Sequence, residues 1–237
     1  MLSVTPTRPV HDCGHCEYRS LRMFCNLDEA ALADFNAIGV QTKFLRGETL
    51  FREEAPSDAV FVLCSGQVKL SCSSREGRTL ILKIAMPGDV LGLGAVISGT
   101  RYEVTAETIE PTQLNRIRRD DFLEFLNRHG QGSLHAAKAL SEEYKSAFFD
   151  ARRLALSGSA AGRLAGVLLG WGRAAACKGG EMRFTMALTH EELANLAGIS
   201  RETVTRTLAR FRREKLIQMS GSAMVLLAPE QLEALSA

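Results

Sequence analysis

The sequence contains no apolar run of about 18 residues, so we expect no transmembrane helix and no membrane partner. Residues 1–16 lack the apolar stretch of a secretory signal, which predicts a cytoplasmic protein whose thiols stay reduced. The 237-residue chain also lacks a large excess of either charge. Because its net charge is only +2, any nucleic-acid binding must depend on a local basic patch.

Motifs of several enzyme classes are missing as well. No glycine-rich phosphate loop ends in Lys-Ser or Lys-Thr, and no Gly-x-Ser-x-Gly nucleophile elbow is present. A cupin-type metalloenzyme needs histidine ligands inside its β-roll, yet all five histidines lie outside residues 40–118. We therefore expect that this protein is not an enzyme.

The first half of the chain has the pattern of an antiparallel β-roll. Asp28 can N-cap a short helix, and from Val40 to Arg116 short apolar or alternating runs are separated by glycines. One such run is DVLGLGAVI, at 89–97. In the run Gln67–Cys72, alternation places Val68, Leu70 and Cys72 on one face and Lys69 and Ser71 on the other. We predict an antiparallel roll or barrel here.

A helical period replaces this pattern after Arg119. Residues 119–128 form a short predicted helix, Gly130 and Gly132 interrupt, and residues 133–156 run on without proline or glycine. Apolar residues recur at 3–4 spacing, which indicates a coiled-coil-like seam. Packing on its own roll is one use of this seam. We favour a homodimer interface, because the helix is longer than the roll, with Ala137, Leu140, Tyr144, Phe148 and Ala151 in it.

The last eighty residues carry the basic patch: residues 158–237 have a net charge of +3, with ten basic and seven acidic residues. Leu156 to Ser159 read as a hinge, with Ser159 capping the next helix. The sequence therefore predicts an α+β protein with four parts: a cysteine-containing segment (1–27), a β-roll sensor domain (28–129), a dimerisation helix (130–157) and a winged helix-turn-helix DNA-binding domain (158–237).

Residues 190–209 have the spacing of a helix-turn-helix. Ala194 is the small residue where the two helices touch, Gly198 tolerates the positive φ of the turn, and Ser200 can N-cap the second helix. Downstream, a hairpin around Gly221 would form a wing and pair with the strand-like segment 182–188. Apolar residues that hold the helices together stand at the expected offsets: Leu193, Ala197, Ile199, Val204 and Leu208.

The second helix of this motif presents polar residues for reading DNA. Arg can donate two hydrogen bonds to guanine, and Glu can accept one from cytosine N4. The alternative is an ordinary solvated helix with an ion pair between Glu202 and Arg206. We expect base-reading roles for Arg201, Glu202, Thr205 and Arg206, and DNA contacts, the basic ones to phosphate, for Ser200, Arg210 and Lys215.

The roll, the long helix and the segment LANLAGISRETVTRTLARF together resemble the cyclic-AMP receptor protein/fumarate-nitrate regulator (Crp/Fnr) family of bacterial transcription regulators. The resemblance covers residues 28–228 and is also carried by GDVLGLGAVISG in the roll. It implies a dimeric activator or repressor with double-stranded DNA and RNA polymerase as partners. It also implies palindromic half-sites with a TGA core, resembling TGTGA in the cyclic-AMP branch and TTGAT in the oxygen-sensing branch.

The resemblance also bears on the effector. In the cyclic-AMP branch the phosphate cassette resembles GELG…RSA, whereas here Leu93 replaces the Glu and Arg101 has no adjacent Ser. A cyclic phosphate needs a cation and several donors, so we expect that cyclic AMP is not the ligand. A roll that takes another small molecule, without any metal, is an alternative.

In the oxygen-sensing branch an N-terminal cysteine cluster and a later cysteine hold a [4Fe–4S] cluster. Cys13, Cys16 and Cys25 match the first three ligands in place, but Asn115 stands at the fourth position. The fourth ligand could then come from Cys64, Cys72, His11 or His15. A zinc site, a thiol switch and a segment that senses nothing are the alternatives. By themselves Cys64 and Cys72 read as core residues, and Cys177 as incidental.

Overall fold

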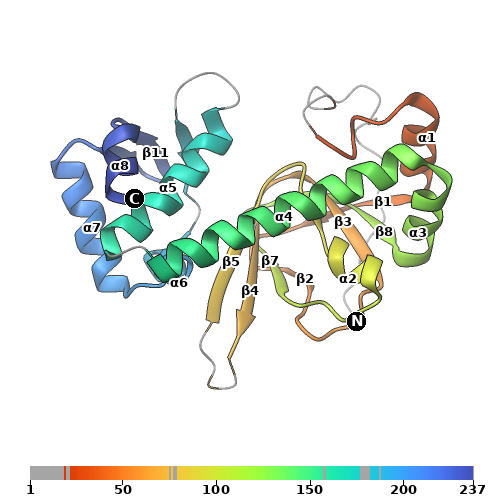
Figure 1. Cartoon of the computed structure of the whole chain (residues 1–237), viewed down its shortest axis with the longest axis horizontal. Coiled ribbons are helices and arrows are strands. Elements are labelled where there is room, and N and C mark those ends of the chain that lie inside the picture. The colour runs from red at the N-terminus through yellow and green to blue at the C-terminus, as the bar shows by residue number, and fades with distance from the viewer. Residues whose placement is uncertain are drawn as a thin grey trace. The chain divides into compact units, whose positions relative to one another are not determined.

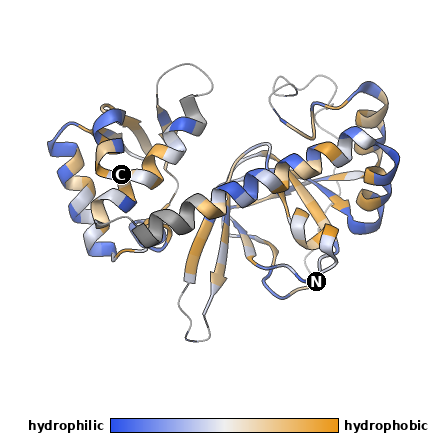
Figure 2. Ribbon diagram, in the orientation of Figure 1, coloured by the Kyte–Doolittle hydropathy of each residue, from blue (hydrophilic) through white to orange (hydrophobic). Residues whose placement is uncertain are grey.

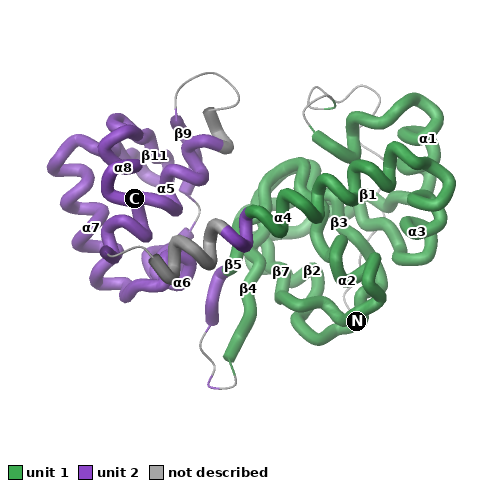
Figure 3. Tube along the Cα trace, in the orientation of Figure 1, with its two compact units in different colours: residues 1–74, 82–145 green, residues 75–81, 146–237 purple. Residues whose placement is uncertain are grey.

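The structure (Figure 1) is a computed structural model. It describes residues 19, 22–74, 76, 79–156, 159–176, 182–186 and 188–236, and the side chains at 149–156 and 174–176 lie outside that description. The chain forms two compact units (Figure 3). The first contains Met1–Ser74 and Leu82–Lys145, and the second contains Arg75–Ile81 and Ser146–Ala237. None of the described helices is both long and apolar enough to cross a membrane.

The first unit begins with helix α1 (Glu29–Ile38), whose N-cap Asp28 accepts a hydrogen bond from the Ala31 backbone N–H, as predicted. Two four-stranded sheets follow, and their strand pairings are antiparallel. One has the order β1-β8-β3-β6, with bounds Gly39–Phe44, Thr112–Arg118, Ala59–Ser65 and Val90–Leu91. The other has the order β2-β7-β4-β5, with bounds Thr49–Phe51, Thr105–Thr108, Val68–Ser73 and Thr79–Ala85. The predicted antiparallel roll is confirmed.

Tyr102 anchors the interior of the roll. Its ring stacks on Phe51 at 4.0 Å between centroids, and its hydroxyl donates to the Ala59 carbonyl at 2.6 Å. Burial raises the pKa of Tyr102 to about 12, so the phenol stays protonated and keeps its donor. Figure 2 shows apolar colours along β3 and β5, and both strands contribute side chains to the core of the roll.

Two predicted strand features differ in the structure. The run 89–97 was expected among the strand-like runs, but it holds only the short strand β6 and then helix α2 (Leu93–Ser98). Apolar runs this short do not distinguish a buried helix from a strand. In β4, Ser71 is buried and Cys72 is half-buried. The clean alternation expected for β4 therefore fails at Ser71 and Cys72.

Helices α3 (Arg119–Arg128) and α4 (Gly130–Leu156) follow the roll, and α4 is the long helix of Figure 1. The predicted break between the two helices is present, but it falls at His129, because Gly130 and Gly132 both belong to α4. A Cβ on Gly132 would lie 2.5 Å from a ring carbon of Phe125. Glycine at this position therefore lets the buried Phe125 ring approach the helix backbone.

The apolar residues of α4 fall on two different faces. Ala136, Ala139 and Leu140 pack against the core of the roll. Tyr144 and Phe148, in contrast, are 72% and 58% exposed, and Leu134 and Ala137 share their face by 3–4 spacing. The single seam expected from the sequence thus divides into an inward face and an outward face. Leu140 belongs to the inward one, and the side chain of Ala151 lies outside the described residues.

Glu143 is the charged residue on the inward side of α4. Burial raises the pKa of Glu143, and the carboxylates of Asp89 and Glu103 raise it further while Lys83 opposes the rise. The folded protein therefore binds this proton more tightly than the unfolded chain does. Stability from this group is fully present below the ordinary carboxyl pKa and is lost as the pH rises through the raised pKa.

We therefore expect Glu143→Gln to raise the unfolding temperature at pH 7.5 and to leave it nearly unchanged at pH 4. The exposed Glu142, on the same helix, supplies the matched control Glu142→Gln. Thermal unfolding at the two pH values measures both variants. Equal shifts for the two variants would show that burial of Glu143 is not the cause.

The second unit is a winged helix. Helix α5 (Ala160–Ala176) begins where Ser159 Oγ accepts the Gly162 backbone N–H at 3.0 Å, which confirms the predicted cap. Helices α6 (His190–Ala197) and α7 (Arg201–Arg213) follow, with a three-stranded antiparallel sheet in the order β10-β11-β9. The strand bounds are Ile217–Ser220, Ala223–Leu226 and Arg183–Thr185. Helix α8 (Pro229–Ser236), which the sequence analysis did not predict, packs against α5.

Candidate nucleic-acid interface

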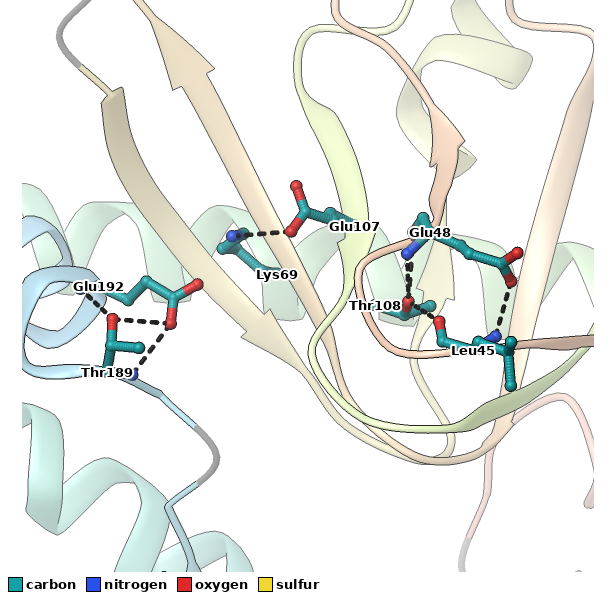
Figure 4. A network of polar contacts seen from close by, with 7 residues as sticks. All are labelled: Leu45, Glu48, Lys69, Glu107, Thr108, Thr189 and Glu192. Atoms are coloured by element: carbon teal, nitrogen blue, oxygen red, sulfur yellow. Dashed lines mark hydrogen bonds and ion pairs between the residues drawn. The ribbon is translucent and has the colours of Figure 1, made fainter.

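The start of α6 is fixed by a capping box. Thr189 Oγ1 accepts the Glu192 backbone N–H at 3.2 Å, and the Glu192 carboxylate accepts the Thr189 backbone N–H at 3.0 Å (Figure 4). Two backbone donors that would otherwise lack partners are satisfied reciprocally. The first turn of α6, which carries His190, is therefore held in one geometry.

The turn between α6 and α7 has the geometry of a helix-turn-helix. Gly198 has φ = 62° and ψ = 42°, a left-handed conformation, and its N–H donates to the Ala194 carbonyl. Ala194 itself is buried, which allows the close approach of the helices. The two helices share a buried apolar set: Leu193, Ala194, Ala197, Val204, Leu208 and Phe211.

Ser200 begins α7 as its N-cap, because Ser200 Oγ accepts the Thr203 backbone N–H at 3.2 Å. The sequence analysis placed Ser200 both as a cap and among the DNA contacts. Its hydroxyl is exposed and also lies 3.0 Å from Thr203 Oγ1. The capping role is thus seen directly, and a DNA contact stays a prediction.

One exposed face at the start of α7 carries the four expected base-reading residues. Arg201, Glu202, Thr205 and Arg206 are all exposed, whereas Val204 on the opposite side is fully buried. Hydrogen bonds from its own backbone N–H and from Ser200 lower the pKa of Glu202, and Arg201 and Arg206 lower it further. Glu202 therefore stays an ionised acceptor, flanked by guanidinium donors.

The basic residues at the end of α7 have different surroundings. Arg210 is half-buried, with its guanidinium carbon 5.4 Å from the Phe211 ring centroid and its Nε 3.8 Å from Glu214. Lys215 is exposed and has φ = 56°, and the next N–H, of Leu216, donates to the Phe211 carbonyl. Lys215 therefore ends α7 in a left-handed cap and precedes the hairpin, whose tip is at Gly221.

The structure describes only three of the six cysteines. Cys13, Cys16 and Cys177 lie outside the described residues, and Cys25, Cys64 and Cys72 are half-buried. Within the described part of the chain, no group of three or more His, Cys, Asp or Glu side chains is placed to hold a metal ion. Asn115 is buried, and its Oδ1 has no hydrogen-bond partner among the described residues.

The structure also places Leu93 and Arg101, the two residues that the sequence analysis compared with the phosphate cassette of the cyclic-AMP branch. Leu93 is buried in the core of the roll, and Arg101 is exposed, with its guanidinium donating to the Glu54 carbonyl at 2.5 Å. Arg101 lines an open surface cavity of about 740 Å³ with Ser57, Thr100 and Arg119. The sequence analysis missed this cavity, because its walls come from three separate segments of the chain, at 54–57, 99–103 and 119.

A β-roll with a winged helix-turn-helix defines a DNA-binding transcription regulator, and comparisons with known proteins agree. The cyclic nucleotide-binding domain family matches residues 41–129, and the Crp-like helix-turn-helix domain family matches residues 162–235. The chain is 30% identical over 228 residues to the transcriptional activatory protein AadR of Rhodopseudomonas palustris, which covers 94% of this chain and 92% of AadR. The chain belongs to the Crp/Fnr family.

Two further comparisons support this assignment. The nitrogen fixation regulation protein FixK of Bradyrhizobium diazoefficiens is 30% identical over 228 residues, with 96% of this chain and 94% of that protein covered. The structure of FixK2 from Bradyrhizobium japonicum has the same fold, with a TM-score of 0.75 at 24% identity over 84% of this chain and 98% of that one. The predicted family, fold class and role as a Crp/Fnr-type transcription regulator with a helix-turn-helix DNA-binding domain are confirmed.

Proposed function

We propose that this regulator binds palindromic DNA as a homodimer and reads each half-site with the exposed face of α7. The observation that carries the proposal is the set of Arg201, Glu202, Thr205 and Arg206 on one exposed face, at the capped N-terminus of α7. Recognition helices present this part to the major groove, and a two-fold dimer places two of them about one helical turn apart.

The half-site preference follows from the donors and acceptors on this face. Glu202 can accept from the cytosine opposite a guanine, and Arg206 can grip a guanine, so a GA step is expected in each half-site. Arg201 adds a second guanine donor and favours TGTGA-like half-sites. Thr205 stands where the branch that prefers TTGAT carries Ser, so the two positions point in different directions. We favour TGTGA-like sites.

Competition binding at fixed salt tests this preference. Full-length protein is titrated into a labelled TGTGA palindrome and challenged with unlabelled TGTGA, TTGAT or scrambled palindromes. The TGTGA competitor is expected to displace best and the scrambled one least. Equal displacement by all three would mean that α7 reads no bases, and stronger displacement by TTGAT would reverse the half-site assignment.

The organisation that we propose for this activity keeps four segments. Residues 1–27 form a cysteine-containing segment, 28–129 the sensor roll, 130–157 the dimerisation helix and 158–237 the DNA-binding domain. RNA polymerase is the proposed partner once DNA is bound. The outward face of α4, with Leu134, Ala137, Tyr144 and Phe148, is the proposed dimer contact, because exposed apolar side chains recur there with the 3–4 spacing of a coiled-coil seam.

We propose a redox or oxygen signal acting through Cys13, Cys16 and Cys25. A [4Fe–4S] cluster would supply reversible redox chemistry, and these three thiolates would hold it. The buried Asn115 does not fit as the fourth ligand, because its amide oxygen is a hard donor and such clusters take thiolates. A zinc site, a thiol switch and a small molecule other than cyclic AMP remain the competing signals, the last favoured by the cavity beside Arg101.

Serine variants of the three cysteines test the metal proposal. If they hold one cluster or metal ion, Ser at any one position is expected to lower the metal content about as much as Ser at all three. Iron, sulfide and zinc assays on anaerobically purified protein, with its visible absorbance, measure this. Cys177→Ser is the matched control and is expected to be silent. Unchanged metal content in the triple variant would end the metal proposal.

A further inference from the structure

His190 joins the two helices of the helix-turn-helix. It is the first residue of α6, where the capping box of Thr189 and Glu192 holds the backbone. The His190 Nδ1 atom lies 2.9 Å from Oγ1 of Thr205 on α7. A half-buried imidazole is thus placed against one of the four residues proposed to read bases.

The hydroxyl of Thr205 has a second partner, which points to the direction of the first hydrogen bond. Thr205 Oγ1 donates to the Arg201 carbonyl at 3.1 Å, one helical turn earlier. A hydroxyl has one proton and two lone pairs. With that proton on the Arg201 carbonyl, the contact with His190 runs from Nδ1–H to Oγ1, an arrangement that requires the Nδ1–H tautomer of His190. One lone pair of Thr205 then remains on the exposed face of α7.

We propose that His190 is a positioning residue for DNA recognition, which makes Thr205 an obligate hydrogen-bond acceptor toward the base edges. The groups that such an acceptor takes in the major groove are the amino groups of cytosine N4 and adenine N6. The inference rests on the proposed reading of DNA by α7. Without His190 no donor holds the other lone pair in place, so the hydroxyl can leave the Arg201 carbonyl and turn its proton toward the groove. Thr205 then no longer distinguishes amino from carbonyl edges.

The charged neighbours of Thr205 explain why its role as an acceptor matters for base recognition. Arg201 and Arg206 supply donors on the same face, and Glu202 supplies an ionised acceptor. With His190 in place, Thr205 gives the face a second acceptor that carries no charge. The face then has two donors and two acceptors at fixed positions, which is a pattern that a base sequence can match.

The tautomer of His190 tests the direction of the hydrogen bond without DNA. Nitrogen NMR of the full-length protein at pH 8 is expected to show the imidazole proton on Nδ1. In Thr205→Val, which removes the hydroxyl and keeps the side-chain shape, the proton is expected to move to Nε2, the usual tautomer. A wild-type proton on Nε2 alone would mean that Thr205 donates to His190, and would overturn the proposal.

A double-mutant cycle tests the role in recognition. His190→Ala is expected to weaken binding to the preferred palindrome by about threefold to tenfold, the factor for one lost hydrogen bond. In a Thr205→Val background the same change is expected to cost less than about twofold, since coupled residues are non-additive. Equal losses in both backgrounds would show that His190 does not act through Thr205.

Base substitutions and a conservative variant separate positioning from a structural role. His190→Ala is expected to reduce discrimination at one base pair only, and His190→Asn, which keeps an N–H at the Nδ1 position, is expected to restore it. Loss of discrimination at every base pair, or an unfolding temperature lowered by His190→Ala, would indicate a structural role instead. If the wild type prefers no palindrome, the proposed function fails, while the tautomer still decides the hydrogen bond.

Discussion

Replacing Arg201 with alanine is expected to cost about 1–3 kcal/mol of binding free energy on a half-site that carries the extra guanine, and much less where thymine stands there. The reason is geometric: a guanidinium at the exposed start of α7 can donate two hydrogen bonds to guanine O6 and N7, and thymine offers no such pair. Binding isotherms on TGTGA and TTGAT palindromes at one salt concentration measure the difference.

The matched control for Arg201 is a basic residue that does not read bases. Lys215 is exposed at the end of α7 with φ = 56°, so Lys215→Gly removes the charge and suits the left-handed backbone better than Lys215→Ala does. It is expected to weaken all sites about equally and to reduce the salt slope by about 1. Equal losses on the TGTGA and TTGAT palindromes from Arg201→Ala would show that Arg201 contacts phosphate and reads no base.

Glutamate at both Tyr144 and Phe148 is expected to give monomers that have lost DNA binding. Each substitution places a charge in the outward apolar face of α4, and burying two such charges in a dimer contact is costly. A monomer also loses the linkage of its two half-site contacts, a factor of about 10²–10⁴ in affinity. Sedimentation and DNA titration of the double variant measure both effects.

Two further substitutions on α4 separate dimerisation from folding. Ser146→Glu adds a charge at an exposed position on the opposite side of the helix and is expected to leave the dimer intact. Leu140→Glu points at the core of the roll, so it is expected to lower the unfolding temperature. An unchanged dimer in the Tyr144 and Phe148 variant would show that this face is not the interface.

The sequence by itself determined the winged helix-turn-helix. Its signals are local: the small residue Ala194, a left-handed glycine at Gly198 and an N-cap at Ser200 lie within seven residues of one another. Each fixes the backbone through hydrogen bonds to near neighbours, so residue type and spacing suffice to predict it. The exposed face of α7 followed directly from the helical period.

The antiparallel roll was also predictable in outline, but its details were not. Short apolar runs between glycines predict strands, yet residues 93–98 form a helix whose burial is decided by what packs against it. Gly132 looked like a helix breaker, and only the position of the Phe125 ring shows why a helix needs glycine there.

Only the tertiary structure decided which residues act together across the chain. It turned Leu140 inward and Tyr144 and Phe148 outward, although all three share one apolar pattern. It also placed His190 beside Thr205, fifteen residues away. The sequence predicts the turn between their helices but not this contact. The physical reason is common to both cases. Helical periodicity fixes which side chains share a face, whereas packing against distant segments decides which face is covered and which atoms meet.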